Sequence, residues 1–156
     1  MNKKLDNIDI SILNALQKNS RISNAELSAK VNLSQTPCLR RLRSLEQSGL
    51  IERYSVQLNH QMIGANVSAF VFVKVNKNTS ANASDFETAV ANLSEVTECC
   101  VLAGAHDYVL RVTTATLQSF ELFLKEKLAN VPMAEAIEST IILNQLIKRE
   151  AHLSHI

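Results

Sequence analysis

The sequence predicts an α+β protein made of two parts, three helices followed by an alternation of strands and helices. Apolar residues recur at helical spacing before Gly49, whereas after it they alternate or run continuously, as in strands. The segment 59–66, around Gly64, has the composition of a turn-containing linker between the two parts. Charge divides in the same way, because residues 1–64 carry +4 and residues 65–156 carry −3. We therefore expect a basic N-terminal module and an acidic C-terminal one.

The first two helices are predicted from their caps and their apolar spacing. Asp6 can cap the first helix, and Ser23 with Glu26 forms a capping box at the start of the second. Asn32 can take the left-handed conformation that ends the second helix. Apolar residues recur at helical spacing in the first helix at Ile8, Ile12, Leu13 and Leu16, and Ala25, Leu27 and Val31 give the second helix an apolar side.

The third helix is expected between Ser34, as its N-cap, and Gly49, with Pro37 in its first turn. One arc of this helix is apolar, and the opposite arc carries polar and basic side chains, with Arg41 on its flank. Two short helices joined by a tight turn, the second of them basic on its outer arc, are typical of a helix-turn-helix that binds DNA. The alternative is a basic face that is merely solvated. The candidate DNA contacts are Thr36, Arg40, Arg41 and Arg43, with Gln35 and Ser44 as lesser contacts.

After Gly49, Tyr54, Val56 and Leu58 alternate with polar residues, which predicts a strand leaving the DNA module as in a winged helix-turn-helix. The predicted boundaries are 1–58 for the DNA-binding domain, 59–66 for the linker, 67–147 for the second domain and 148–156 for a C-terminal tail.

The second domain is predicted to contain four strands and two helices. The strands are expected at 67–75, 96–103, 108–114 and within 136–147, and the helices at 85–93 and 117–130. The order β-α-β-β-α-β is that of a ferredoxin-like domain.

The first strand predicts an interface. Val71, Val73 and Val75 face one way, and Phe70 and Phe72 face the other. Two helices cover only one face of such a sheet, so the face with the phenylalanines needs a partner. A second copy of the chain is the simplest partner, and the alternative is that the tail, residues 146–156, folds back over this face.

Composition narrows the class of protein. The hydrophobic content of 46% suffices for a packed core, and no apolar run approaches the roughly 20 residues of a membrane span. No basic-then-apolar secretory segment opens the chain, and the three cysteines lack metal-ligand spacing. We expect a cytoplasmic protein in a reduced setting, with no cofactor, no metal site and no membrane partner.

Two sets of residues resemble the Lrp/AsnC (feast/famine) transcription regulators. The chain is similar to the family's helix-turn-helix at Leu5-Asp6, Asp9-Ile10, Arg21-Ile22-Ser23, Glu26-Leu27-Ser28, Ser34, Thr36-Pro37-Cys38-Leu39, Arg41, Leu45-Glu46, Gly49 and Ile51. Gly104-Ala105-His106-Asp107-Tyr108 resembles the family's Gly-x-x-Asp-Tyr loop, and Ser139-Thr140 stands where its last strand begins. Gln35 departs from the pattern, since relatives often carry proline there.

The resemblance implies a regulator that binds double-stranded promoter DNA as a homodimer, often assembled into tetramers or octamers, and responds to an amino acid. It implies that the backbone of Leu102, Ala103, Gly104 and Ala105 serves the effector carboxylate and that Asp107 pairs with its ammonium. A glycine at 104 suits a close backbone approach or a positive φ. Without the resemblance, this loop is a hairpin turn whose aspartate caps its own backbone. The full set of expected effector residues adds His106, Tyr108, Ser139 and Thr140.

Two other functions share the pattern. Some haem-biosynthesis decarboxylases resemble the same architecture, although the four histidines here, His60, His106, His152 and His155, have no paired acid or nucleophile motif near them. A nucleoid-type architectural protein that wraps DNA with little sequence choice is the other alternative. The sequence favours a sequence-specific regulator that is not an enzyme.

Overall fold

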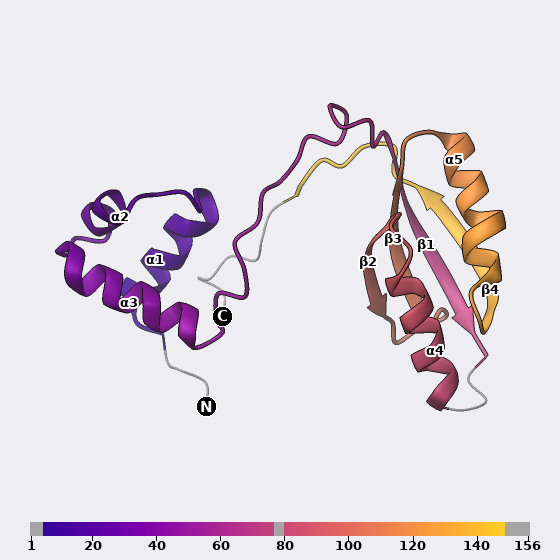
Figure 1. The fold of residues 1–156 in the computed structure, drawn as a ribbon, viewed down its shortest axis with the longest axis horizontal. Helices are drawn as coiled ribbons and strands as arrows, with labels where there is room; N and C mark the ends of the chain where they lie inside the picture. Colours follow the sequence, from indigo (N-terminus) through magenta and orange to yellow (C-terminus); the bar gives the residue numbers. More distant parts are fainter. Residues whose placement is uncertain (1–4, 77–79, 149–156) are drawn as a thin grey trace. The chain divides into compact units, whose positions relative to one another are not determined.

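The computed structural model describes residues 5–76 and 80–148, and the chain divides into two compact units (Figure 1). The first unit holds residues up to Gln57 and the segment from Ile147 onward, and the second holds Leu58–Leu146.

The described part of the first unit contains three helices, α1 (Asn7–Lys18), α2 (Asn24–Lys30) and α3 (Gln35–Gln47). The expected caps are confirmed: the Asp6 carboxylate accepts from the Asp9 amide at 2.8 Å, and Ser23 and Glu26 form a capping box. These three helices share one apolar core, which contains Ile12, Leu13, Leu16, Leu27, Val31, Cys38 and Leu45. The helical arrangement follows directly from the apolar spacing of the sequence.

The turns on either side of α3 adopt the conformations that their residues favour. Asn32, between α2 and α3, has φ +54°, and Gly49, just after α3, has φ +74°. Both lie in the left-handed region, which asparagine and glycine enter at low cost. Ser34 occupies the N-cap position of α3, although its side chain makes no capping hydrogen bond.

The described strands of the second unit form one antiparallel sheet in the order β2-β3-β1-β4. The strands are β1 (Val67–Val75), β2 (Val96–Val101), β3 (Tyr108–Thr114) and β4 (Ala134–Ile141). The helix α4 (Ser80–Ala91) follows β1, and α5 (Leu117–Leu122) follows β3. After α5 the chain continues as a π-helical segment η1 (Phe123–Lys127) and a 3₁₀ turn η2 (Leu128–Asn130). The predicted ferredoxin-like order is confirmed.

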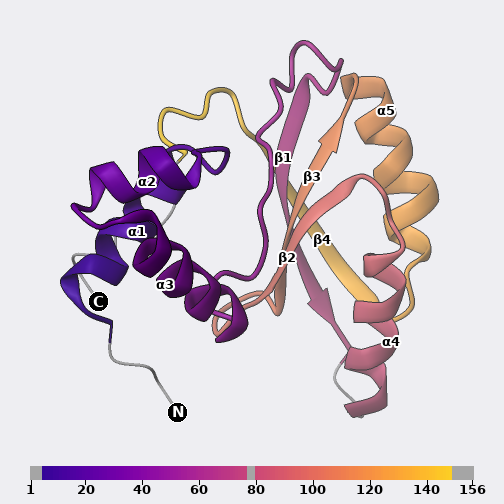
Figure 2. The ribbon, with the colours of Figure 1, turned by 60° about the vertical axis from the view of Figure 1, so that its left-hand side comes forward.

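Both helices lie on the same face of the sheet (Figure 2). Val71 and Val73 of β1 and Leu110 of β3 are fully buried beneath them, together with Phe86 of α4 and Phe123 of η1. Because side chains alternate along a strand, Phe70 and Phe72 project from the other face, where both are half-buried. The described start of the tail leaves Leu146 and Ile147 exposed, and residues 149–156 lie outside the described part of the chain.

Four sequence predictions need correction. The strand expected at Tyr54–Leu58 is wrong, because residues 52–59 are neither helix nor strand: alternation alone makes no strand without a neighbour to complete the hydrogen-bond ladder. The helix expected at 85–93 begins earlier, at Ser80, and the second strand ends at Val101 rather than at 103. The last strand begins at Ala134, so Ser139 and Thr140 lie in its second half and not at its start.

Candidate functional site

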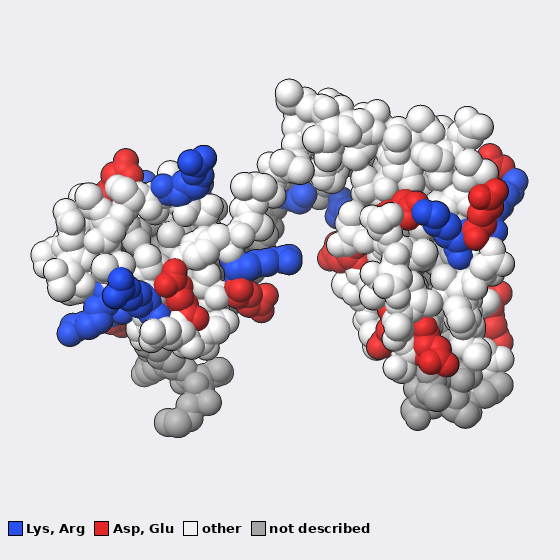
Figure 3. Space-filling model, viewed as in Figure 1, with Lys and Arg blue, Asp and Glu red and all other residues white. Residues whose placement is uncertain are grey.

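The outer face of α3 presents free cationic groups. Arg40 and Arg43 are exposed, and within the described part of the chain neither makes an ion pair or a hydrogen bond. They line one shallow, open surface of the helix together with Thr36, Leu39, Ser44 and Gln47. Figure 3 shows a group of lysine and arginine side chains (blue) on the surface of this unit. Leu39 and Gln47 were not among the predicted DNA contacts. Gln47 was expected on the polar arc of the helix without a role, and Leu39 was expected on the apolar arc, whereas both line this surface.

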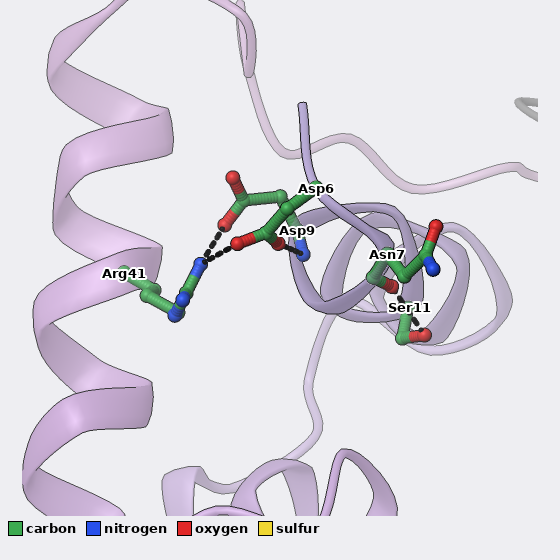
Figure 4. Close-up of polar contacts among 5 residues, drawn as sticks. All are labelled: Asp6, Asn7, Asp9, Ser11 and Arg41. Carbon is green, nitrogen blue, oxygen red and sulfur yellow. Dashed lines mark hydrogen bonds and ion pairs between the residues drawn. The ribbon is translucent and has the colours of Figure 1, made fainter. Parts of the chain in front are cut away.

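Arg41 is arranged differently from the arginines beside it. Its Nη1 donates to Asp6 Oδ2 at 2.7 Å and to Asp9 Oδ1 at 2.9 Å, so the side chain runs from α3 to the start of α1 (Figure 4). The pKa of Asp6 lies below its usual value, first because its carboxylate accepts from the Asp9 amide and then because it accepts from Arg41. The carboxylates raise the pKa of the Arg41 guanidinium in turn. The structure thus separates the three predicted arginines into two exposed groups and one internal ion-pair partner.

The two ends of α3 are tied to neighbouring segments. At its start the Gln35 carbonyl accepts from Asn24 Nδ2 of α2 at 3.1 Å, while the Gln35 side chain is exposed. At its end Tyr54 donates its hydroxyl to Glu46 Oε1 at 2.7 Å. Burial and this carboxylate raise the pKa of Tyr54 to about 12. Sequence reasoning missed Asn24 and Glu46 because neither partner lies at helical spacing.

The loop between β2 and β3 is built around Asp107. Its carbonyl accepts from the Leu102 amide at 2.7 Å, and its amide donates to the Val73 carbonyl at 3.0 Å. The Asp107 carboxylate accepts from the Val75 amide at 3.0 Å. The β1–β3 pairing ends with Val73 opposite Tyr108, so β3 offers no strand residue opposite Val75. Asp107 supplies the acceptor there, so it caps the backbone of β1.

The residues on either side of Asp107 also have partners. His106 Nε2 lies 3.2 Å from Glu138 Oε2, and its ring centroid lies 5.3 Å from that of Phe72 on the helix-free face of the sheet. Tyr108 is buried and donates its hydroxyl to Glu87 Oε1 of α4 at 2.8 Å. Burial, followed by this carboxylate, raises the pKa of Tyr108 to about 12. The side chains at 106–108 therefore hold the loop to β1, β4 and α4.

Of the remaining predicted effector residues, Gly104 lies in the loop, whereas Ser139 and Thr140 lie in β4. A Cβ at Gly104 would meet no heavy atom within 4 Å, and this glycine does not have a positive φ, so the positive-φ explanation for it is wrong. Ser139 and Thr140 pair with Val71 and Phe70, whereas the loop begins at the row formed by Val101, Tyr108 and Val73. The fold therefore does not place them in the loop's own row of the sheet.

Other kinds of site find no support in the described residues. Across residues 5–76 and 80–148, no three histidine, cysteine or acidic side chains gather as metal ligands would. In the same ranges no helix combines the length and the apolar character that crossing a membrane requires.

Family models match both parts of the chain. Residues 5–52 match a winged helix-turn-helix DNA-binding domain, and residues 68–151 match the Lrp/AsnC ligand binding domain. The leucine-responsive regulatory protein of Escherichia coli (strain K12) is 38% identical over 144 residues, which cover 92% of this chain and 88% of that protein.

Solved structures with similar chains extend over nearly the whole molecule. A transcriptional regulator from Neisseria meningitidis in complex with L-Met has a TM-score of 0.90 at 33% identity and covers 94% of each chain. An AsnC family transcriptional regulator from Agrobacterium tumefaciens has a TM-score of 0.92 at 29% identity and covers 97% of this chain and 99% of that one. With an exposed basic helix in one unit and a ligand-binding fold in the other, this chain belongs to the Lrp/AsnC family of DNA-binding transcriptional regulators.

Proposed function

We propose that this regulator recognises promoter DNA by placing α3 in the major groove, with Thr36, Arg40 and Arg43 as the main contacts. The observation that carries this proposal is the pair of exposed arginines without partners among the described residues, Arg40 and Arg43. Arginine hydrogen-bonds guanine in the major groove or neutralises a phosphate. Gln35 at the start of α3 and Ser44 on its outer surface are the lesser contacts.

We propose that the protein acts as a homodimer through the helix-free face of the sheet. Phe70 and Phe72 stand on this face beside the half-buried Val109 of β3. Phe70, Phe72 and Val109 form an apolar strip on this face, bordered by Arg111 and Glu138. Such a strip is a typical association surface, and two-fold dimers are the commonest oligomers. A dimer also supplies two copies of α3 for successive major grooves. Assembly beyond the dimer, to a tetramer or octamer, is part of the same proposal.

The dimer is tested with Phe72→Glu, measured by light scattering coupled to size exclusion. Burying a charge in an apolar contact is costly, so we expect this variant to elute as a monomer. Leu117→Glu is the matched control, because Leu117 is exposed on α5, on the opposite side of the sheet. Equal dimerisation by the two variants would place the interface elsewhere.

We propose an amino acid as the effector, bound at the loop between β2 and β3. The similar regulator from Neisseria meningitidis is a complex with L-Met, which supports this class of ligand. In this proposal the backbone amides of Ala103–Ala105, open at Gly104, bind the effector carboxylate, and Leu102 borders the site because its own amide donates to the Asp107 carbonyl. Asp107 balances the effector ammonium while it also holds β1. His106 and Tyr108 flank the loop in this proposed site, and Ser139 and Thr140 border it from β4, opposite Val71 and Phe70.

A thermal-shift screen over the twenty amino acids, including L-Met, tests the effector. A ligand at 100 times its dissociation constant stabilises the folded state by about 2.7 kcal/mol, which is a measurable shift. If no amino acid shifts the unfolding temperature, the loop is only structural in this protein.

The competing functions make different predictions. An architectural protein would bind random DNA about as tightly as a selected duplex, whereas a sequence-specific regulator prefers the selected one at fixed salt. We propose that the protein is not an enzyme. Tight, stoichiometric binding of porphyrin would instead favour the decarboxylase function. A regulator that acts on promoter DNA works in the cytoplasm, where we place it.

A further inference from the structure

We propose that Arg41 is a positioning residue that fixes the orientation of α3 through Asp6 and Asp9 of the α1 start, and that it does not contact DNA. This inference rests on the proposed DNA recognition by α3. It divides the arginines of one helix into DNA contacts, Arg40 and Arg43, and an internal support.

The geometry places a single guanidinium nitrogen between two carboxylates. Arg41 Nη1 lies 2.7 Å from Asp6 Oδ2 and 2.9 Å from Asp9 Oδ1, and Figure 4 shows both contacts meeting at this one nitrogen. The residues of α3 that are buried in the core of this unit, Cys38 and Leu45, are apolar. Apolar packing has no direction, whereas two charge-assisted hydrogen bonds fix a helix at one defined rotation.

The burial of Asp9 explains why Arg41 remains in place when DNA is near. The Asp9 side chain is 4% exposed, and that of Asp6 is 51% exposed. A buried carboxylate without its cation is strongly destabilised. An Arg41–phosphate contact would be weaker than the Arg41–Asp9 ion pair that it replaces, because the phosphate is solvated and salt screens the contact.

Arg41 could either contact DNA or position α3, and these two roles predict opposite changes in DNA affinity when Asp6 or Asp9 is neutralised. Asp6 and Asp9 are negative groups within a module that binds a polyanion, so neutralising either one removes a repulsion from DNA. If Arg41 contacted DNA itself, neutral residues at these positions would release it and strengthen binding. If Arg41 positions α3, the same substitutions weaken binding to the preferred sequence.

The experiment measures binding to a duplex that the wild-type protein selects from a random library and to a random duplex, both at fixed salt. Asp6→Asn is the main variant, because asparagine still caps α1 while the ion pair is lost. We expect Asp6→Asn to bind the selected duplex about two- to fivefold more weakly. We expect about tenfold or more for Asp9→Asn, whose carboxylate is buried. Neither variant should bind the random duplex more weakly than wild type, so the ratio of the two affinities falls.

Controls separate positioning from folding. Circular dichroism checks that each variant is folded at the assay temperature. If Asp9→Asn is unfolded, the result for Asp6→Asn alone decides whether Arg41 positions α3. Arg41→Lys should recover part of the binding that Arg41→Ala loses, since an ammonium can still pair with Asp9. Selected-duplex binding by a folded Asp6→Asn protein that is equal to or tighter than wild type would overturn the positioning role. A wild-type protein that enriches no sequence would overturn the proposed DNA recognition itself and this inference with it.

Discussion

The outer face of α3 and the loop between β2 and β3 use their polar side chains in opposite ways. On α3, Arg40 and Arg43 are exposed and have no partner among the described residues. In the loop, His106, Asp107 and Tyr108 are all bound to other parts of the same unit. One region has free side chains for a large polyanion, and the other uses its side chains to shape a backbone.

This difference follows from what each region is proposed to bind. DNA has a regular charged surface, so a rigid helix with unpaired cations suits it. An amino acid has a carboxylate and an ammonium a few ångströms apart, and such a ligand needs groups held at fixed separation. The internal bonds of the loop provide that rigidity, and Arg41 provides it for α3.

Removing the Asp107 carboxylate should have the largest effect on the stability of the loop. Asp107→Ala leaves the Val75 amide without its acceptor, and a buried amide left unpaired costs about 1–3 kcal/mol. The measurement is the free energy of unfolding by urea. Asp85→Ala on α4 is the control, because Asp85 is an exposed carboxylate.

Asp107→Asn separates the two roles of this residue. Asparagine retains an oxygen acceptor for Val75 but removes the charge that we propose for the effector ammonium. We therefore expect near-wild-type stability without the amino-acid thermal shift. An Asp107→Ala protein as stable as Asp85→Ala would mean that the loop does not depend on this bond.

Removing the Tyr108 hydroxyl should have a smaller effect. Tyr108→Phe loses the hydrogen bond to Glu87, but the exposed Glu87 can turn to water, so we expect a loss of about 0.5–1.5 kcal/mol in unfolding free energy. The amino-acid response should persist, because the ring still packs against Phe86. A Tyr108→Phe protein that unfolds as readily as Asp107→Ala would show that α4, rather than β1, holds the loop.

The parts of the fold that were predictable depend on local sequence. Asp6, the Ser23–Glu26 pair and Gly49 act within one turn of their own position, so caps and helix ends could be predicted from the sequence. The alternation of Val71 and Phe72 likewise predicted the two faces of the sheet. The strand expected at Tyr54–Leu58 failed because a strand requires a neighbour that the local pattern cannot supply.

The roles within the sites were harder to predict because their partners are distant in sequence. Arg41 and Asp6 are 35 positions apart, and Asp107 and Val75 are 32 apart. On the helix, Arg41 belongs to the same basic run as Arg40 and Arg43. Its position on the flank of the outer arc could be predicted, but its ion pairs depend on the packing of α1 against α3. Asp107 likewise acts as an acceptor because β1 extends to Val75, beyond its last pair with β3 at Val73.

The smallest expected effect concerns acid. The folded-state pKa of Asp6 lies below its usual value of 3.8, so this group stabilises the fold above about that pH and the contribution is lost as pH falls through the folded-state pKa. The unfolding temperature of the wild type should therefore fall more between pH 5 and about pH 3 than that of Asp6→Asn. Parallel curves for the two proteins would mean that the Asp6–Arg41 pair adds no stability.

The most direct test of the DNA-binding role of α3 compares two double variants that each lack two positive charges. The measurement is the affinity of each variant for the duplex that the wild-type protein selects. Arg40→Ala with Arg43→Ala removes the exposed cations of α3, and Lys18→Ala with Lys30→Ala removes two exposed cations from α1 and α2. A base or phosphate contact is worth about 1–3 kcal/mol, so we predict a loss of about 100-fold or more for the arginine pair and only a few-fold for the lysine pair. Equal losses for the two pairs would contradict the assignment of α3 as the DNA-binding surface.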